Sequence, residues 1–129
     1  MKFIKKSSKI IFYFANLFLI IAYVYPGNFI GCYLYNNCDF EPQIINNFFI
    51  SINHFFAFSF LTALGLFAFD NISELKVLKF YLLFIAVFLE LLHFLIPIRA
   101  FQFSDLLGNV LGITVIIILY FFKYEFYKK

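Results

Sequence analysis

The stretch ELLHFLIPIRAFQFSDLLGNVLG, residues 90–112, places several polar and ionisable side chains in a largely apolar sequence. They lie on either side of Pro97, which ends a helix because it lacks an N–H donor. Ionisable groups beside or inside apolar spans cost free energy, so each is a candidate functional residue. They are Glu90, His93, Arg99, Asp105 and Asn109.

The rest of the chain is composed mainly of long apolar runs. Hydrophobic residues make up 64% of the 129 residues and charged residues 13%. Soluble domains average about 25% charged residues. A helix of about 20 apolar residues spans a bilayer. The sequence therefore predicts an all-α integral membrane protein, a single domain over residues 1–129, with four transmembrane helices at about 10–25, 48–69, 80–96 and 105–122.

The connecting segments are expected to be loops. Residues 26–47 are rich in Gly, Asn and Pro, and residues 70–79 form a short charged segment. Residues 97–104 are expected to form a tight turn, with Ser104 or Asp105 capping the last helix. The first apolar run follows a basic arm, as in a signal peptide, but no small-residue cleavage site follows it. An uncleaved first transmembrane helix is favoured.

The basic residues predict which side of the membrane each loop occupies. All the lysines lie near the chain ends or in residues 70–79, whereas Arg99 is the only basic residue at the opposite ends of the spans. The positive-inside rule therefore predicts that both termini and residues 70–79 are cytoplasmic. Tyrosines at the expected helix ends, Tyr23 and Tyr25 among them, are typical of the membrane interface.

This topology brings the polar residues of three helices to one depth. We expect a pocket in the outer leaflet that binds a lipid or a lipid-linked anionic ligand, with the planar guanidinium of Arg99 holding a phosphate or carboxylate. The alternative is that these side chains hydrogen-bond one another only to fix helix packing, because polar side chains often join membrane helices. The pocket residues are His54, Glu90, His93, Arg99, Asp105 and Asn109.

Other functions stay open at this stage. Glu90 and His93 have the i,i+3 spacing of carboxylate-bridged metal bundles, with His54 and Asp105 as further ligands, but no established metal motif is present. We therefore predict no metal and no cofactor. The alternatives to a binding protein are a membrane-embedded hydrolase or transferase acting on a lipid-linked substrate, and a structural subunit with a membrane-protein partner. No basic stripe interleaved with aromatic residues indicates nucleic-acid binding.

Two cysteines, Cys32 and Cys38, lie in the first predicted outer loop with five residues between them. An oxidising exterior would permit a disulfide there. The sequence leaves a disulfide and two free thiols equally open.

The order and spacing of these elements resemble the VanZ-like family of small bacterial membrane proteins. The similarity covers residues 53–112 and rests on four motifs: His54-Phe55, Glu90-x-x-His93, Pro97-Ile98-Arg99 and Asp105-x-x-x-Asn109-x-x-Gly112. Asn53, His93 and Ile98 depart from the Lys, Gln and Gly that are common in that family. The resemblance implies a multi-pass protein of the bacterial cytoplasmic membrane with a role in the cell envelope. The founding member is associated with glycopeptide-antibiotic resistance, and no enzymatic activity follows from the resemblance.

Overall fold

A computed structural model describes residues 2–45 and 49–127 of the chain. These residues form five α-helices: α1 Lys2–Val24, α2 Phe29–Tyr35, α3 Ile52–Ala68, α4 Ile72–Leu92 and α5 Phe103–Tyr127. The described residues contain no β-strand. The predicted all-α fold class is confirmed.

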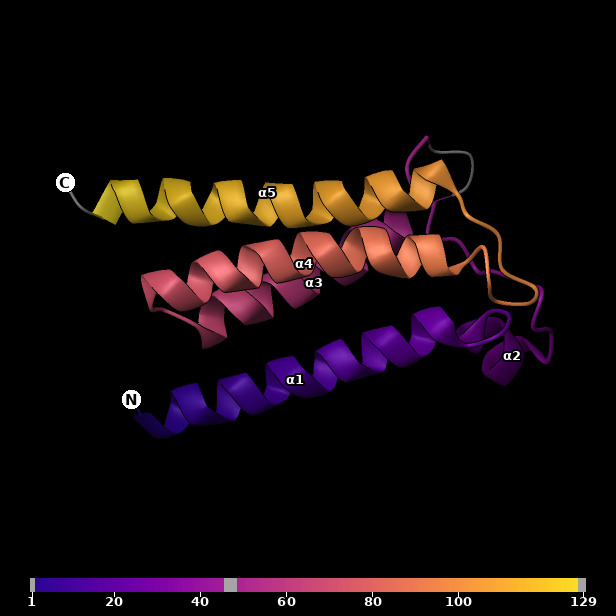
Figure 1. The fold of residues 1–129 in the computed structure, drawn as a ribbon, viewed down its shortest axis with the longest axis horizontal. Helices are drawn as coiled ribbons and strands as arrows, with labels where there is room; N and C mark the ends of the chain where they lie inside the picture. Colours follow the sequence, from indigo (N-terminus) through magenta and orange to yellow (C-terminus); the bar gives the residue numbers. More distant parts are fainter. Residues whose placement is uncertain (1, 46–48, 128–129) are drawn as a thin grey trace.

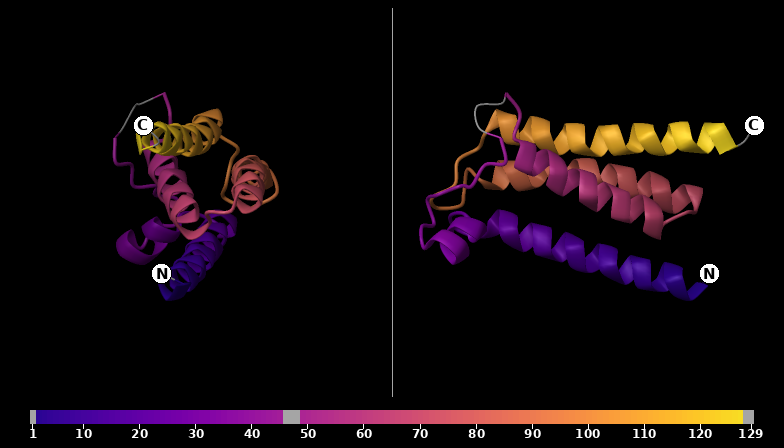
Figure 2. Two further views of the ribbon diagram at one scale, coloured as in Figure 1. Left: turned by 90° about the vertical axis from the view of Figure 1, so that its left-hand side faces the viewer. Right: turned by 180° about the vertical axis from the view of Figure 1, so that it is seen from behind.

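Four long helices, α1, α3, α4 and α5, run alongside one another, and the short α2 lies at one end of the bundle (Figure 1). The start of α1 and the end of α5 both lie at the opposite end, on different sides of the bundle, as the view from behind also shows (Figure 2). We call these the α2 end and the terminal end. The α2 end also carries the connections before α3 and before α5, so the loops that were expected to face outward lie together there (Figure 2).

Two helices, α1 and α5, are long and apolar enough to cross a membrane, judged by length and composition. Helix α3 is apolar but has 17 residues, which corresponds to about 25 Å of helix. Helix α4 begins with a charged segment that contains Glu74, Lys76 and Lys79. Helix length and composition thus agree with a membrane-spanning helix at two of the four predicted positions.

The loop prediction for residues 70–79 is wrong, because α4 begins at Ile72. The side chain of Asn71 accepts a hydrogen bond from the Ser73 N–H and so caps the helix. Glu74 lies in the first turn, where a negative charge is favourable near the positive end of the helix dipole. The other end of α4 also differs from the prediction, because the helix stops at Leu92 and a turn precedes Pro97.

The first loop, too, is partly helical. Asn28 caps the start of α2 by accepting from the Gly31 N–H, and Asn36 ends the helix in the left-handed conformation with φ 50°. The disulfide between Cys32 and Cys38 joins α2 to the segment that follows it. The same asparagine residues that indicated a loop therefore form the caps of a short helix.

Ion pairs connect α1 with the α3–α4 connection at the terminal end. Lys5 pairs with Asp70, and Lys9 Nζ lies 2.8 Å from Glu74 Oε1. Lys9 also lies over the ring of Phe69 at 4.8 Å from its centroid. Lysines that the charge pattern assigned to topology alone thus also contact an acidic residue of the α3–α4 connection and another in the first turn of α4.

Two glycines of α5 allow this helix to pack closely on α3. A Cβ added at Gly108 would lie 2.5 Å from the carbonyl oxygen of Ser51, and one at Gly112 would meet the carbonyl oxygen of Phe55. Ser59 Oγ donates to the Gly112 carbonyl oxygen at 3.3 Å across the same contact. The small-residue patch of α5 is therefore where its backbone approaches α3.

Replacing Gly108 by Ala should destabilise the bundle by about 1–3 kcal/mol, because the obstructing atom belongs to the backbone and cannot rotate away. Thermal unfolding in detergent would measure the change. Thr114→Ala, at an exposed position of the same helix, is the matched control and should unfold like the parent protein. Equal unfolding temperatures for Gly108→Ala and the parent would show that the two backbones are not in contact.

Candidate functional site

Six polar side chains are buried together near the α2 end of the bundle. Glu90 and Asn109 are fully buried, and the others expose 8% of their surface or less. They come from all four long helices, including α1, for which no site residue was expected. We call this set the polar cluster: Tyr23, His54, Glu90, His93, Asp105 and Asn109.

Tyr23 of α1 connects the two halves of the cluster. Its hydroxyl oxygen lies 2.8 Å from His54 Nδ1 and 2.7 Å from Asn109 Oδ1. Its backbone carbonyl oxygen lies 3.2 Å from His93 Nε2, and its ring stacks on the His93 ring at 5.6 Å between centroids. One residue thus contacts both histidines, one through its side chain and the other through its backbone and ring.

These contacts determine where the proton of the His54 ring lies. Asn109 Nδ2 donates to the Ala86 carbonyl oxygen at 3.3 Å, so Asn109 Oδ1 is the acceptor for the Tyr23 hydroxyl. A hydroxyl has only one proton to donate. Tyr23 therefore accepts from His54 Nδ1–H, and a neutral His54 carries its lone pair on Nε2.

His54 Nε2 faces the carboxylate of Asp105 at 3.6 Å from Oδ2. This distance is longer than a normal hydrogen bond. Both side chains are about nine-tenths buried, with exposed fractions of 10% and 8%. When His54 is neutral, its Nε2 lone pair thus faces the Asp105 carboxyl group in a space that excludes most solvent.

The second histidine has a different set of partners. His93 Nε2 faces a carbonyl oxygen, which can only accept, so this nitrogen donates to the carbonyl oxygen of Tyr23. His93 Nδ1 lies 3.3 Å from Glu90 Oε1, so the two atoms share a proton held by one or the other. Glu90 Oε1 also accepts from the Gln102 N–H at 3.0 Å. Glu90 therefore connects the end of α4 to the segment before α5.

Arg99 lies beside the polar cluster and contacts the last turn of α1. Its Nη2 donates to the Ala22 carbonyl oxygen at 3.1 Å, and its Nε donates to the Tyr25 carbonyl oxygen at 3.4 Å. The last carbonyls of a helix lack intrahelical partners and carry the negative end of the helix dipole. Arg99 thus has a capping role that the sequence did not predict.

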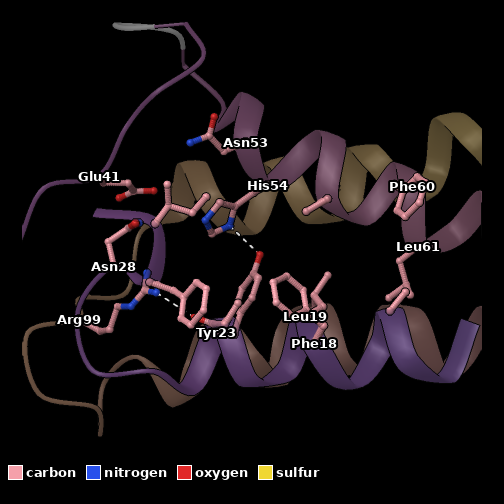
Figure 3. Close-up of a pocket in the computed structure, with 15 residues that line it drawn as sticks. Phe18, Leu19, Tyr23, Asn28, Glu41, Asn53, His54, Phe60, Leu61 and Arg99 are labelled. Carbon is pink, nitrogen blue, oxygen red and sulfur yellow. Dashed lines mark hydrogen bonds between the residues drawn. The ribbon is translucent and has the colours of Figure 1, made fainter. Parts of the chain in front are cut away.

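A cavity of about 390 Å³ lies between α1 and α3 and is polar at one end only (Figure 3). Arg99 and His54 lie at its polar end, with Asn28, Glu41 and Asn53. Apolar side chains such as Phe18, Leu19, Phe60 and Leu61 line the rest. A smaller cavity of about 170 Å³ shares Arg99 and Glu41 with the first and also reaches His93 and Asp105.

The structure brings together five of the six residues that the sequence predicted for the site, in the polar cluster, and places Arg99 next to them. Sequence reasoning missed two residues. Tyr23 was assigned to the membrane interface, although it is 8% exposed. Glu41 was one of two acidic residues in the first loop, and only the fold brings it beside His54 and Asp105.

Comparisons of the chain with protein-family models, with curated proteins and with solved structures find no match.

Replacing Tyr23 by Phe should destabilise the protein by about 1–3 kcal/mol, because His54 Nδ1–H and Asn109 Oδ1 would each lose their buried partner. The ring packing stays the same in this variant. Tyr33→Phe removes a hydroxyl from a residue that is 69% exposed and is the matched control. Thermal unfolding of both variants in detergent measures the effect, and equal losses in the two would contradict the assigned network.

Proposed function

We propose that this chain is a multi-pass membrane protein that binds an anionic lipid, or a lipid-linked anionic ligand, in the cavity between α1 and α3. The observation that carries the proposal is the division of that cavity into a polar end and an apolar body. A membrane lipid has the same division between head group and acyl chain.

The outward surface of the bundle supports the membrane placement. Large apolar side chains are exposed along every long helix, including Phe14 at 69%, Phe67 at 69%, Phe80 at 76% and Phe122 at 61%. Soluble monomers rarely expose large contiguous apolar patches. We place all four long helices across the bilayer, with the terminal end in the cytoplasm and the α2 end outside, as the distribution of basic residues predicts.

The apolar body of the cavity suits an acyl chain. On α1 its lining residues Ala15, Phe18, Leu19 and Ala22 follow the i, i+3, i+4, i+7 spacing of one helix face. Ala57, Phe60 and Leu61 face them from α3. Because both helices would lie in the bilayer, a lipid can enter this space sideways without carrying its chain through water.

The polar end suits a head group that accepts hydrogen bonds. Arg99 has five N–H donors, and its contacts with α1 orient the guanidinium at the wall between the two cavities. Its planar fork is well matched to a phosphate or carboxylate. In this proposal Asn28, Asn53 and His54 contact neutral parts of the head group, while Glu90, His93, Asp105 and Asn109 fix the positions of the neighbouring groups.

The resemblance of residues 53–112 to VanZ-like proteins agrees with this proposal, because it implies an envelope role in a bacterial cytoplasmic membrane. The ligand would then be an envelope lipid or a lipid-linked precursor. Resistance to a glycopeptide antibiotic would be one consequence of holding such a ligand.

Filling the apolar body of the cavity should abolish lipid binding. Ala57→Trp places a large side chain in the cavity, whereas Phe56→Trp changes the adjacent residue, which is 55% exposed. We expect binding of phosphatidylglycerol, measured by native mass spectrometry of the purified protein, to fall at least about tenfold in the first variant only. Unchanged binding in Ala57→Trp would place the lipid elsewhere.

Removing the Arg99 guanidinium should selectively weaken the binding of anionic lipids. Arg99→Gln is expected to lower the affinity for phosphatidylglycerol about tenfold, the loss of a charge-assisted contact, and to leave binding of the uncharged lipid diacylglycerol, which has no phosphate, unaffected. Lys123→Gln removes a positive charge at the terminal end and is the matched control. An equal loss for both lipids in Arg99→Gln would mean that the residue acts only through the end of α1.

The proposed topology predicts the labelling of single cysteines in intact cells. In a variant with Cys32 and Cys38 replaced by Ala, a membrane-impermeant maleimide should label Gln43→Cys and should not label Lys76→Cys. Both positions are exposed in the structure, so accessibility within the protein does not decide the result. Labelling of Lys76→Cys in intact cells would overturn the orientation.

A further inference from the structure

We propose that Glu41, His54 and Asp105 form a binding site for a divalent transition-metal cation, with Zn²⁺ as the preferred ion. One ligand atom from each residue lies within 4.8 Å of the other two. The three residues come from the loop before α3, from the first turn of α3 and from the first turn of α5. The sequence-based metal alternative used Glu90 and His93 with His54 and Asp105 as further ligands, and it did not include Glu41.

The proton arrangement of His54 is the first independent support for this site. Because Tyr23 donates to Asn109, it accepts from His54 Nδ1–H, and Nε2 presents its lone pair to Asp105. A metal-bound histidine has this arrangement, with one ring nitrogen on the metal and the other N–H donated to a fixed partner. A cation between Nε2 of a neutral His54 and an ionised Asp105 is attracted to both atoms.

The distances agree with a cation between the two groups. Zinc bonds to imidazole nitrogen and carboxylate oxygen are about 2.0–2.2 Å long, so two tetrahedral ligand atoms lie roughly 3.4 Å apart. His54 Nε2 and Asp105 Oδ2 are 3.6 Å apart. Glu41 is partly exposed and lies in a loop, so its carboxylate can adjust to complete the ligand set.

The chemistry of the three ligands selects the type of metal. One imidazole and two carboxylates suit zinc or manganese, whereas calcium and magnesium favour oxygen ligands alone. The two negative charges of the carboxylates, with an uncharged imidazole, balance the two positive charges of a divalent ion. Three protein ligands also leave at least one position of a tetrahedral ion open, next to cavities that both contain Glu41.

The inference goes beyond the lipid proposal and is tested on the protein without added lipid. The purified chain of 129 residues, freed of any affinity tag and treated with EDTA, is titrated with Zn²⁺ by isothermal titration calorimetry. We expect one ion per chain and no comparable heat with Mg²⁺. Substitution by Co²⁺ should give the visible absorption of a low-coordinate N/O site.

Variants of the first loop distinguish this site from general binding to acidic groups. Glu41→Gln removes one ligand without altering helix packing and should weaken Zn²⁺ binding at least about tenfold. Asp39→Asn, an exposed carboxylate two residues away, is the matched control and should bind like the parent protein. His54→Asn should abolish one-to-one binding, and Glu41→Gln keeps the test decisive if that variant does not fold.

Three results would overturn the site: a parent protein that binds no Zn²⁺, equal affinities for Glu41→Gln and the parent, or equal losses in Glu41→Gln and Asp39→Asn. The outcome is separate from that of the lipid experiments. Zinc binding without lipid binding would leave the cation site standing and remove the lipid proposal, and the reverse result would do the opposite.

Discussion

The single proton of the Tyr23 hydroxyl constrains the arrangement of the polar cluster. The hydroxyl donates it to Asn109 Oδ1, because the amide nitrogen of Asn109 donates to the Ala86 carbonyl oxygen. Tyr23 must then accept from His54, which fixes the tautomer of a residue on another helix. Three helices are thereby joined through one oxygen atom, and a fourth contributes the carbonyl that orients the amide. The Ala86 carbonyl oxygen can only accept, so it orients the Asn109 amide. The directions of the Tyr23–Asn109 and His54–Tyr23 hydrogen bonds then follow.

The apolar runs and the polar residues between them predicted much of this arrangement. Helices were expected where long uncharged segments occur, and the depth of His54, Glu90 and Asp105 followed from counting residues along helices that alternate in direction. Tyr23 was not recognised, because a tyrosine at a helix end is typical of the membrane interface. Its orientation toward the interior depends on how α1 is rotated against α3, and residues 10–25 carry large apolar side chains on every side of the helix, so they do not specify that rotation.

The other missed elements were missed for different reasons. Helix α2 and Glu41 lie in a segment whose residues predict turns, and local sequence does not determine where a long connection folds back. Arg99 lies near the end of α1 through contacts between residues 74 and 77 positions apart in the chain. The charges in segment 70–79 indicated a loop. The Asn71 cap and the favourable position of Glu74 nevertheless allow α4 to start within this segment. Contacts distant in sequence thus place Glu41 and Arg99, whereas the start of α4 follows from local capping.

Helix dipoles account for the positions of Asp105, Arg99 and His93 at the α2 end but not for that of Glu90. Asp105 lies in the first turn of α5, whereas Arg99 and His93 lie at the ends of α1 and α4, so each is near a helix end that favours it. Glu90 lies in the last turn of α4, where a negative charge is disfavoured. Among the described residues Glu90 Oε2 has no hydrogen-bond partner. Packing alone would favour a neutral residue here, since a buried carboxylate with an unpaired oxygen costs free energy. Glu90 is therefore the residue of the polar cluster that a purely structural role explains least well.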